Sequence, residues 1–416
     1  MSKWVNYFKD PYLVLEVQKF FGVYPINDKF AKKHYNSTSN GNVVQFKKKD
    51  KNNSVINNGS INEILDDTES AVTSGSDTET KDYVVTNKFW YYLFVFGTEL
   101  GDEIFYASFI PFWFWNVDGA VGRRVVMVWT MIMCIGQGIK DIICWPRPAS
   151  PPVCRLQQKW ALEYGMPSTH AMVGISIPFS VVLYTMQRYE YPVSIGFIIA
   201  FLWCTVISVS RLYLGMHTVL DVIVGLLLAT LLMIPIVPLV DRMDSYILTS
   251  QWSPILLSFI SIAIIAYYPK SNIWTPTRQD TTMVVSVCVG VHIGAWTNYQ
   301  LGIMSEPQTS PPYSVIWPSY EMLGLALLRV ALGFSCILAT RAVCKSASYA
   351  TLCFLLRLNS SDLRRTVHTG PSSAKNTVEL CYKYITYAAM GFNTLYLLPS
   401  VFSMLGIHRP SFYTEI

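Results

Sequence analysis

The chain has 416 residues, of which 51% are apolar and only 14% are charged. Soluble globular domains usually carry about 25% charged residues, so this composition, with a mean hydropathy of +0.31, excludes an ordinary soluble protein and indicates a polytopic membrane protein. The net charge of +5 is too small to argue for nucleic-acid binding. The nine cysteines have no metal-type spacing and fall mostly in apolar runs, so we expect buried thiols. Cys144 and Cys154 flank a polar loop and could form a disulfide if that loop is lumenal.

The N-terminal part of the chain contains no predicted span. Residues 1–33 hold the amphipathic stretch DPYLVLEVQKFFGVYP, which we expect to lie on the membrane surface or on the rest of the protein. From 34 to 88 the residues are mainly Asn, Ser, Thr, Lys, Asp and Glu, which cannot fill a core, so a disordered polar tail is predicted. The basic patch Lys47–Lys51 could contact anionic lipid, although a solvated charge run is the better interpretation.

After Lys88 the sequence turns apolar, and a membrane-spanning helix needs about 20 apolar residues. We predict spans near 89–115, 123–143, 171–188, 193–210, 217–240, 252–268, 281–299, 321–343, 346–357 and 381–406. The short segment 346–357 is either a span or an interfacial or re-entrant piece, so the count is roughly eight to ten. The expected fold is all-α, a polytopic membrane helical bundle with a catalytic core at 89–245 and a C-terminal transmembrane bundle at 246–416.

The first polar group among the spans runs from Lys140 to Arg147. Ionisable residues at span edges are costly and are therefore candidates for function. Lys140 ends an apolar helix, and Pro146 and Pro148 fix Arg147 in a rigid turn. Two cations attract an anion, and the arginine fork suits phosphate oxygens. Snorkelling of basic side chains at a span end explains this group equally well.

The second group is Pro167-Ser168-Thr169-His170, just before an apolar run. Pro167 can start the helix, and the free N–H groups of its first turn, with the hydroxyls of Ser168 and Thr169, would form an anion site. His170 comes from the same turn. Taken alone, an ordinary helix cap with a bystander histidine is a slightly better interpretation.

The third group contains Arg211, His217 and Asp221. His217 and Asp221 have i,i+4 spacing, which makes them neighbours on one helix face. An aspartate that accepts from one imidazole nitrogen leaves the other nitrogen free as a nucleophile. Packing does not explain such a pair, so function is favoured here. Counting spans places all three groups on the same side of the membrane, which predicts a phosphate site with a nucleophile and a proton donor.

These three groups resemble the signature of the type 2 phosphatidic acid phosphatase (PAP2) superfamily, the lipid phosphatases related to vanadium haloperoxidases. That signature reads KxxxxxxRP, PSGH and SRxxxxxHxxxD, and every spacing matches. One departure is Thr169, where most relatives have glycine. The PSTHA form and the additional C-terminal spans look like the sphingosine-1-phosphate phosphatase branch. The resemblance therefore implies a PAP2/haloperoxidase-like helical core.

The resemblance also implies roles for the residues that match the signature. Three cations would neutralise the phosphoryl oxygens: Lys140, Arg147 and Arg211. Ser168 and neighbouring backbone N–H groups would donate to the phosphate, and the Thr169 hydroxyl would add a contact.

The remaining signature residues would carry the reaction itself. His217 would attack phosphorus and form a phosphohistidine, with Asp221 orienting it, and His170 would protonate the leaving alkoxide. Because fixed cations can replace a divalent metal, we expect no metal and no cofactor.

Substrate and sidedness are further expectations. The implied substrate is a sphingoid base phosphate. Phosphatidate, dolichyl diphosphate and glucose 6-phosphate are the alternatives within the superfamily, and a multi-span anion or lipid transporter is the alternative outside it. The bilayer is the expected partner, nucleic acid is not, and the residues neither demand nor exclude a homodimer.

Four arginines lie on the face opposite the site, and the positive-inside rule makes that face cytosolic: Arg123, Arg124, Arg188 and Arg242. We therefore expect a protein of the endoplasmic reticulum membrane with a lumenal active site. A single span at 89–115 would also make the tail lumenal, which suits its sequons at Asn36, Asn52 and Asn58. A re-entrant pair in that segment, favoured by its acidic residues, would reverse the tail.

Overall fold

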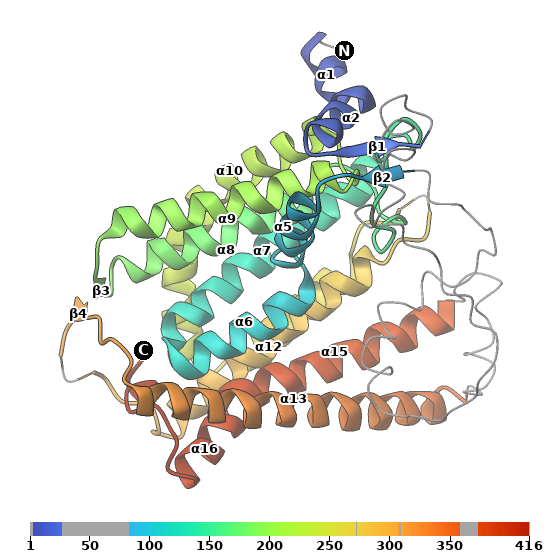
Figure 1. The fold of residues 1–416 in the computed structure, drawn as a ribbon. Helices are drawn as coiled ribbons and strands as arrows, with labels where there is room; N and C mark the ends of the chain where they lie inside the picture. Colours follow the sequence, from blue (N-terminus) through green and yellow to red (C-terminus); the bar gives the residue numbers. More distant parts are fainter. Residues whose placement is uncertain (1–2, 27–82, 272, 308, 358–372, 416) are drawn as a thin grey trace, which may run out of the picture.

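The computed structural model describes residues 3–26, 83–271, 273–307, 309–357 and 373–415. These form a bundle of long helices with two short strand pairs at its edges (Figure 1), which confirms the predicted all-α class. The N-terminal half contains the helices α1 (Lys3–Lys9), α2 (Pro11–Phe20), α5 (Lys88–Glu99), α6 (Glu103–Asn116), α7 (Gly119–Ile143), α8 (Thr169–Thr185), α9 (Val193–Tyr213) and α10 (Val219–Thr249). The C-terminal half contains α11 (Ser253–Ala266), α12 (Thr277–Gln300), α13 (Tyr320–Leu355), α15 (Ser373–Leu395) and α16 (Leu397–Met404).

Four of the described helices are long and apolar enough, by length and composition, to cross a membrane. They are α7, α9, α10 and α13, and α8 and α11 are shorter apolar helices. The predicted total of roughly eight to ten spans stays a prediction. The nine cysteines remain thiols.

The predicted polar tail at 34–88 lies mostly outside the described residues. Its last part is ordered, because β2 (Tyr83–Val85) pairs antiparallel with β1 (Val23–Pro25). This pairing joins the end of the amphipathic segment to the start of α5. A second strand pair, β3 (Tyr189–Glu190) with β4 (Tyr313–Ser314), links the loop after α8 to the loop before α13.

The segment predicted as a single span at 89–115 is not one continuous helix, because the chain breaks between α5 and α6. The carboxylate of Asp102, which is 2% exposed, caps α6 by accepting from the backbone N–H of Glu103 at 2.6 Å. The same carboxylate forms an ion pair with Lys159 at 2.8 Å. The turn also brings Gly101 against the site, since a Cβ at this position would lie 3.0 Å from Cδ2 of His170.

The amphipathic N-terminal segment packs on the rest of the protein, at the end of the bundle where α9 terminates. The buried side chain of Gln18 donates to the carbonyls of Cys154 and Tyr213 at 2.6 and 2.9 Å, and accepts from the backbone N–H of Cys154 at 3.0 Å. Both attachment points of the tail, Val23–Pro25 and Tyr83–Val85, therefore lie at this end.

In the C-terminal half, the two segments predicted at 321–343 and 346–357 form the single helix α13, and the span predicted at 381–406 is divided between α15 and α16. Helices α12 and α15 cross with their backbones in contact. A Cβ at Gly290 would lie 2.0 Å from the carbonyl oxygen of Ala388, and a Cβ at Gly391 would lie 2.5 Å from that of Val287. Only glycine permits this approach.

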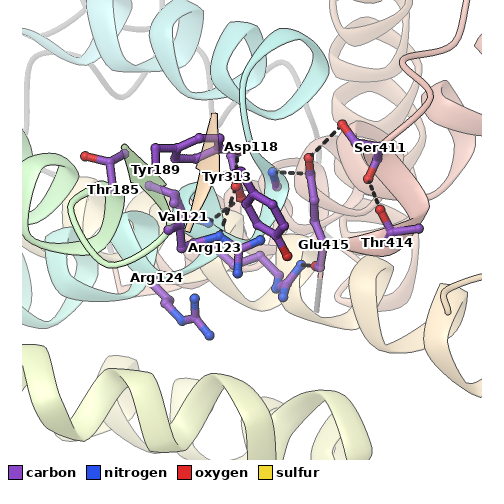
Figure 2. Close-up of polar contacts among 12 residues, drawn as sticks. Asp118, Val121, Arg123, Arg124, Thr185, Tyr189, Tyr313, Ser411, Thr414 and Glu415 are labelled. Carbon is purple, nitrogen blue, oxygen red and sulfur yellow. Dashed lines mark hydrogen bonds and ion pairs between the residues drawn. The ribbon is translucent and has the colours of Figure 1, made fainter. Parts of the chain in front are cut away.

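A buried ion-pair cluster lies at the start of α7 (Figure 2). The Arg123 guanidinium donates to both carboxylate oxygens of Asp244 on α10, at 3.0 and 3.2 Å, and to the backbone carbonyl of Glu415 at 3.1 Å. The carboxylate of Glu415 accepts from the backbone N–H of Gly119 at 2.6 Å. These contacts fix the C-terminal segment against the end of α7 that lies far from Lys140.

Asp118 caps α7 and joins the same cluster. Its Oδ2 accepts from Arg188 Nε at 3.1 Å and from the Tyr189 hydroxyl at 2.7 Å. Arg124 is also paired, at 3.0 Å from Asp241. Three of the four arginines assigned to the face opposite the site are therefore neutralised by carboxylates.

Replacing Arg123 with methionine is expected to lower the free energy of unfolding by about 3 kcal/mol, because it leaves the buried carboxylate of Asp244 without its bidentate partner. Thermal unfolding in detergent micelles measures the change. The matched control is Arg242→Met on α10, where the arginine is exposed and the expected change is within about 0.5 kcal/mol. Equal shifts in both variants would contradict a stabilising role for the cluster.

Candidate active site

The three predicted polar groups meet at one end of the bundle. Lys140 Nζ at the end of α7 donates to the Thr169 hydroxyl at the start of α8, at 3.1 Å. The backbone N–H of Ser168 donates to the carbonyl of Asp221 at the start of α10, at 3.1 Å. Arg147 Nη1 donates to the carbonyl of Met216 at 2.8 Å. The three groups are therefore brought together at one end of the bundle, as the prediction of a common site requires.

The N-terminus of α8 faces the middle of this cluster. Ser168 is its N-cap and Thr169 its first residue, so the helix begins two residues after Pro167. The Ser168 hydroxyl is buried, makes no cap hydrogen bond and has no partner among the described residues. Gly225 on α10 permits this position, since a Cβ there would lie 2.7 Å from the Ser168 carbonyl oxygen.

Lys140 and Arg147 converge on one glutamate. The ammonium of Lys140, which is fully buried, donates to Glu163 Oε2 at 2.6 Å. Arg147 Nε donates to the Glu163 backbone carbonyl at 2.8 Å, and its Nη2 lies 3.9 Å from Oε2. The loop 144–168 thus turns back, and the carboxylate of Glu163 in this loop contacts both Lys140 and Arg147.

Arg211 supplies unpaired donors to the site. Its Nη1 donates to the Thr98 hydroxyl at 2.5 Å and to Gln157 Oε1 at 3.1 Å. Its Nε and Nη2 are buried without a partner in the described part of the chain. A buried guanidinium N–H without an acceptor is unfavourable, so this arrangement favours an anion at that place.

The geometry of His217 differs from the prediction. The N-cap of α10 is Thr218, so His217 lies just before the helix rather than on it. Asp221 completes a capping box, in which its Oδ2 accepts from Thr218 N at 2.7 Å and its own N–H donates to the Thr218 hydroxyl at 3.2 Å. His217 Nδ1 lies 3.8 Å from that Oδ2, which is too long for a hydrogen bond. The predicted His217–Asp221 hydrogen bond is therefore absent, and the two groups are within ion-pair distance.

Arg147 defines the tautomer of His217. Its Nη1 lies 3.4 Å from His217 Nε2. A guanidinium can only donate, so Nε2 is the acceptor and the proton of a neutral ring is on Nδ1, toward Asp221. Burial lowers the pKa of His217 well below its usual value, and the charges of Arg147 and Arg211 lower this pKa further. The ring is therefore neutral with its lone pair on Nε2, as a nucleophile requires.

His170, the second residue of α8, provides the other imidazole. Its Nε2 is buried without a partner among the described residues, and its ring meets Trp160 edge-on at 6.0 Å between centroids. It is therefore available to a substrate oxygen.

Sequence reasoning missed three residues that contact the cations: Thr98, Gln157 and Glu163. Glu163 lies four residues before Pro167, and a lone carboxylate in the loop between the first two groups is the signal that could have identified it. Thr98 lies at the end of α5, in the segment that was interpreted as a continuous span.

Comparisons with known proteins show which family the chain is similar to. The PAP2 superfamily matches residues 122–243, which include all eight predicted site residues. Sphingosine-1-phosphate phosphatase 1 of Rattus norvegicus is 40% identical over 324 residues, covering 78% of this chain and 74% of the relative. Sphingosine-1-phosphate phosphatase 2 of Homo sapiens is 38% identical, covering 78% and 80%. Lipid phosphate phosphatase delta of Arabidopsis thaliana is 27% identical, covering 73% and 80%. No solved structure matches the chain.

Proposed function

Since this chain belongs to the PAP2 superfamily, within its sphingosine-1-phosphate phosphatase branch, we infer that it is a phosphomonoesterase of sphingosine 1-phosphate and related long-chain base phosphates. The observation that carries this inference is the convergence of three buried cations and two imidazoles at one end of the bundle. Packing alone does not account for such a cluster, because Arg211 keeps two buried N–H donors without an acceptor in the described chain, which costs free energy.

Phosphate binding depends on donors that are already in place. Arg211 Nε and Nη2 and the Ser168 hydroxyl are buried and unpaired in the described chain, and the N-terminus of α8 adds backbone N–H groups and the positive end of its dipole. Lys140 and Arg147 supply the remaining positive charge. Donors fixed before the substrate arrives need little reorganisation as charge develops in the transition state.

The chemical steps then involve the two histidines. His217 Nε2 attacks phosphorus, forming an N–P bond as the P–O bond to the lipid breaks, and His170 donates a proton to the departing alkoxide. A water molecule next attacks the phosphohistidine, giving its proton to His170 and releasing phosphate and neutral His217. Asp221, 3.8 Å from Nδ1, stabilises the positive charge on the ring of His217 while the phosphoryl group is attached. An alkoxide is a poor leaving group, so general acid catalysis is required.

The same proposal extends to location. We place the chain in the endoplasmic reticulum membrane with the active site facing the lumen. Arg123, Arg124, Arg188 and Arg242 lie at the opposite end of the bundle, and the positive-inside rule counts such residues toward the cytosolic side. The amphipathic N-terminal segment packs at the site end, through Gln18, and so shares the lumenal side.

A substrate panel tests the proposed function. Purified protein in EDTA is expected to release phosphate from sphingosine 1-phosphate and dihydrosphingosine 1-phosphate with a higher kcat/KM than from phosphatidate, dolichyl diphosphate or glucose 6-phosphate. EDTA should leave the rate unchanged, since fixed cations do the work of a metal, and vanadate should inhibit as a phosphate analogue. A preference for phosphatidate would overturn the proposed substrate but leave the proposed phosphatase reaction in place. Binding without hydrolysis of any of these would favour a transporter.

A further inference from the structure

Two buried carboxyl groups near the end of α7 do not belong to the PAP2 signature. One is Glu163, which is 6% exposed and 2.6 Å from Lys140 Nζ. The other is Asp280 on α12, which is 7% exposed. Oδ2 of Asp280 is buried and has no hydrogen-bond partner among the described residues. A buried carboxylate oxygen without a donor is costly, so this atom is expected to have a function.

The face of α12 that carries Asp280 is turned toward α7. Thr277, one turn earlier on the same face, donates to the carboxylate of Asp141, which directly follows Lys140. Burial raises the pKa of Asp280 well above its usual value, the carboxylates of Glu103 and Glu163 raise this pKa further, and the ammonium groups of Lys383 and Lys140 lower it. Helix α12 therefore brings Asp280 to the end of α7 that carries Lys140, on the side toward the C-terminal bundle.

A buried lysine of α15 is engaged with the residue that precedes Asp280. Lys383 on α15 donates to Gln279 Oε1 at 2.8 Å, and Gln279 in turn donates to Glu379 at 2.5 Å. None of the ion pairs within the described ranges includes Asp280. Asp280 is therefore a buried carboxyl group without an ion-pair partner there, and an approaching cation would favour its ionised form.

We propose that Glu163 and Asp280 form a subsite for the ammonium group of the substrate. This inference rests on the proposed function, because a long-chain base phosphate carries its amine on the carbon next to the phosphate-bearing carbon. A phosphate held by Lys140, Arg147 and Arg211 puts that ammonium within a few ångströms of the edge of this group of cations. Glu163 then exchanges its contact with Lys140 for one with the substrate, and Oδ2 of Asp280 gains the donor that it lacks.

The subsite selects substrates by charge. A glycerol-based lipid phosphate has no ammonium at this position, so on binding it would leave the Asp280 carboxylate unpaired. Leaving a buried polar group without its partner is the most effective way for a site to reject an analogue.

Paired substrates test the proposal. One is sphingosine 1-phosphate, and the other is the same molecule with a hydroxyl in place of the 2-amino group. The wild-type chain is expected to have a higher kcat/KM for the amine. Asp280→Asn is expected to lower the ratio of the two kcat/KM values by about tenfold, the size expected when one hydrogen bond between charged groups is lost.

Glu163→Gln is a second variant with the same expected fall in the ratio, in case Asp280→Asn does not fold. The matched control is Asp241→Asn, which changes a half-exposed carboxylate paired with Arg124 and should leave the ratio unchanged. If both subsite variants keep the wild-type ratio, or if the wild-type chain does not prefer the amine, the subsite is overturned while the proposed function stands. If the wild-type chain hydrolyses neither substrate, the proposed function itself fails.

Discussion

Replacing His217 with alanine is expected to lower phosphate release from sphingosine 1-phosphate by at least about 10⁴-fold, because it removes the atom that attacks phosphorus. The substitution leaves the phosphate-binding donors in place, since the hydrogen bond of Arg147 to the Met216 carbonyl does not involve the imidazole. The variant should therefore still bind vanadate reversibly while turnover is lost. Loss of turnover with retained binding is what distinguishes a nucleophile from a phosphate-binding residue.

Two measurements check this expectation. Rapid acid-free quenching of the wild-type chain with radiolabelled substrate should trap a phosphoenzyme that is stable to alkali and labile to acid, as expected for a phosphohistidine, and the variant should show none. The matched control is His408→Ala, at an exposed position of the C-terminal segment, which should retain wild-type turnover. Unimpaired hydrolysis by His217→Ala would remove the nucleophile assignment.

Replacing His170 with alanine is expected to lower turnover of sphingosine 1-phosphate by about 10²–10⁴-fold, the usual contribution of a general acid. The loss should depend on the leaving group. An alkoxide must be protonated as it departs, whereas p-nitrophenolate departs without a proton. The variant should therefore keep much more of its activity on p-nitrophenyl phosphate than on the lipid.

Comparing the two substrates in both histidine variants separates the two roles. His217→Ala should be inactive on either substrate, because both reactions need the nucleophile. His170→Ala should accumulate more phosphoenzyme from p-nitrophenyl phosphate than the wild-type chain, because the second step has lost its base. If His170→Ala lowers the turnover of both substrates by the same factor and accumulates no phosphoenzyme, the imidazole of His170 is not the general acid.

The fold class and the site could be predicted from the sequence for different reasons. Low charge and long apolar runs predict a helical membrane protein, because the backbone polar groups of a segment in the bilayer must be hydrogen-bonded within the protein. The site was predictable because its cations and histidines occur at fixed spacing within three short segments. Lys140, Ser168 and Asp221 then meet as expected, through contacts between the ends of α7, α8 and α10.

The errors arose where tertiary contacts decide local structure. The segment 89–115 is apolar on both sides of Asp102, and only the ion pair with Lys159 and the cap on α6 make a break favourable there. Conversely, α13 continues through Lys345 because Ala342, Ala347 and Ala350 favour the helix and neither glycine nor proline interrupts it there. Neither outcome can be derived from hydropathy.

The distance between His217 and Asp221 also depends on where helix α10 begins. Spacing places the two residues on one helix face, but the helix starts at Val219 with Thr218 as its cap. The carboxylate of Asp221 therefore accepts from the backbone N–H of Thr218, and the imidazole of His217 lies 3.8 Å away from it. Asp280 was overlooked for a different reason, since it is 59 residues from the last residue of the signature and only the crossing of α12 over α7 brings it near.

The break between α5 and α6 also determines what lies against the second imidazole. Helix α6 starts at Glu103 and α8 at Thr169, and the turn before α6 brings Gly101 to the ring of His170. A Cβ at position 101 would lie 3.0 Å from Cδ2 of that ring. Any side chain at this position would therefore press on the imidazole. A residue outside the signature thus limits where the proposed acid can stand.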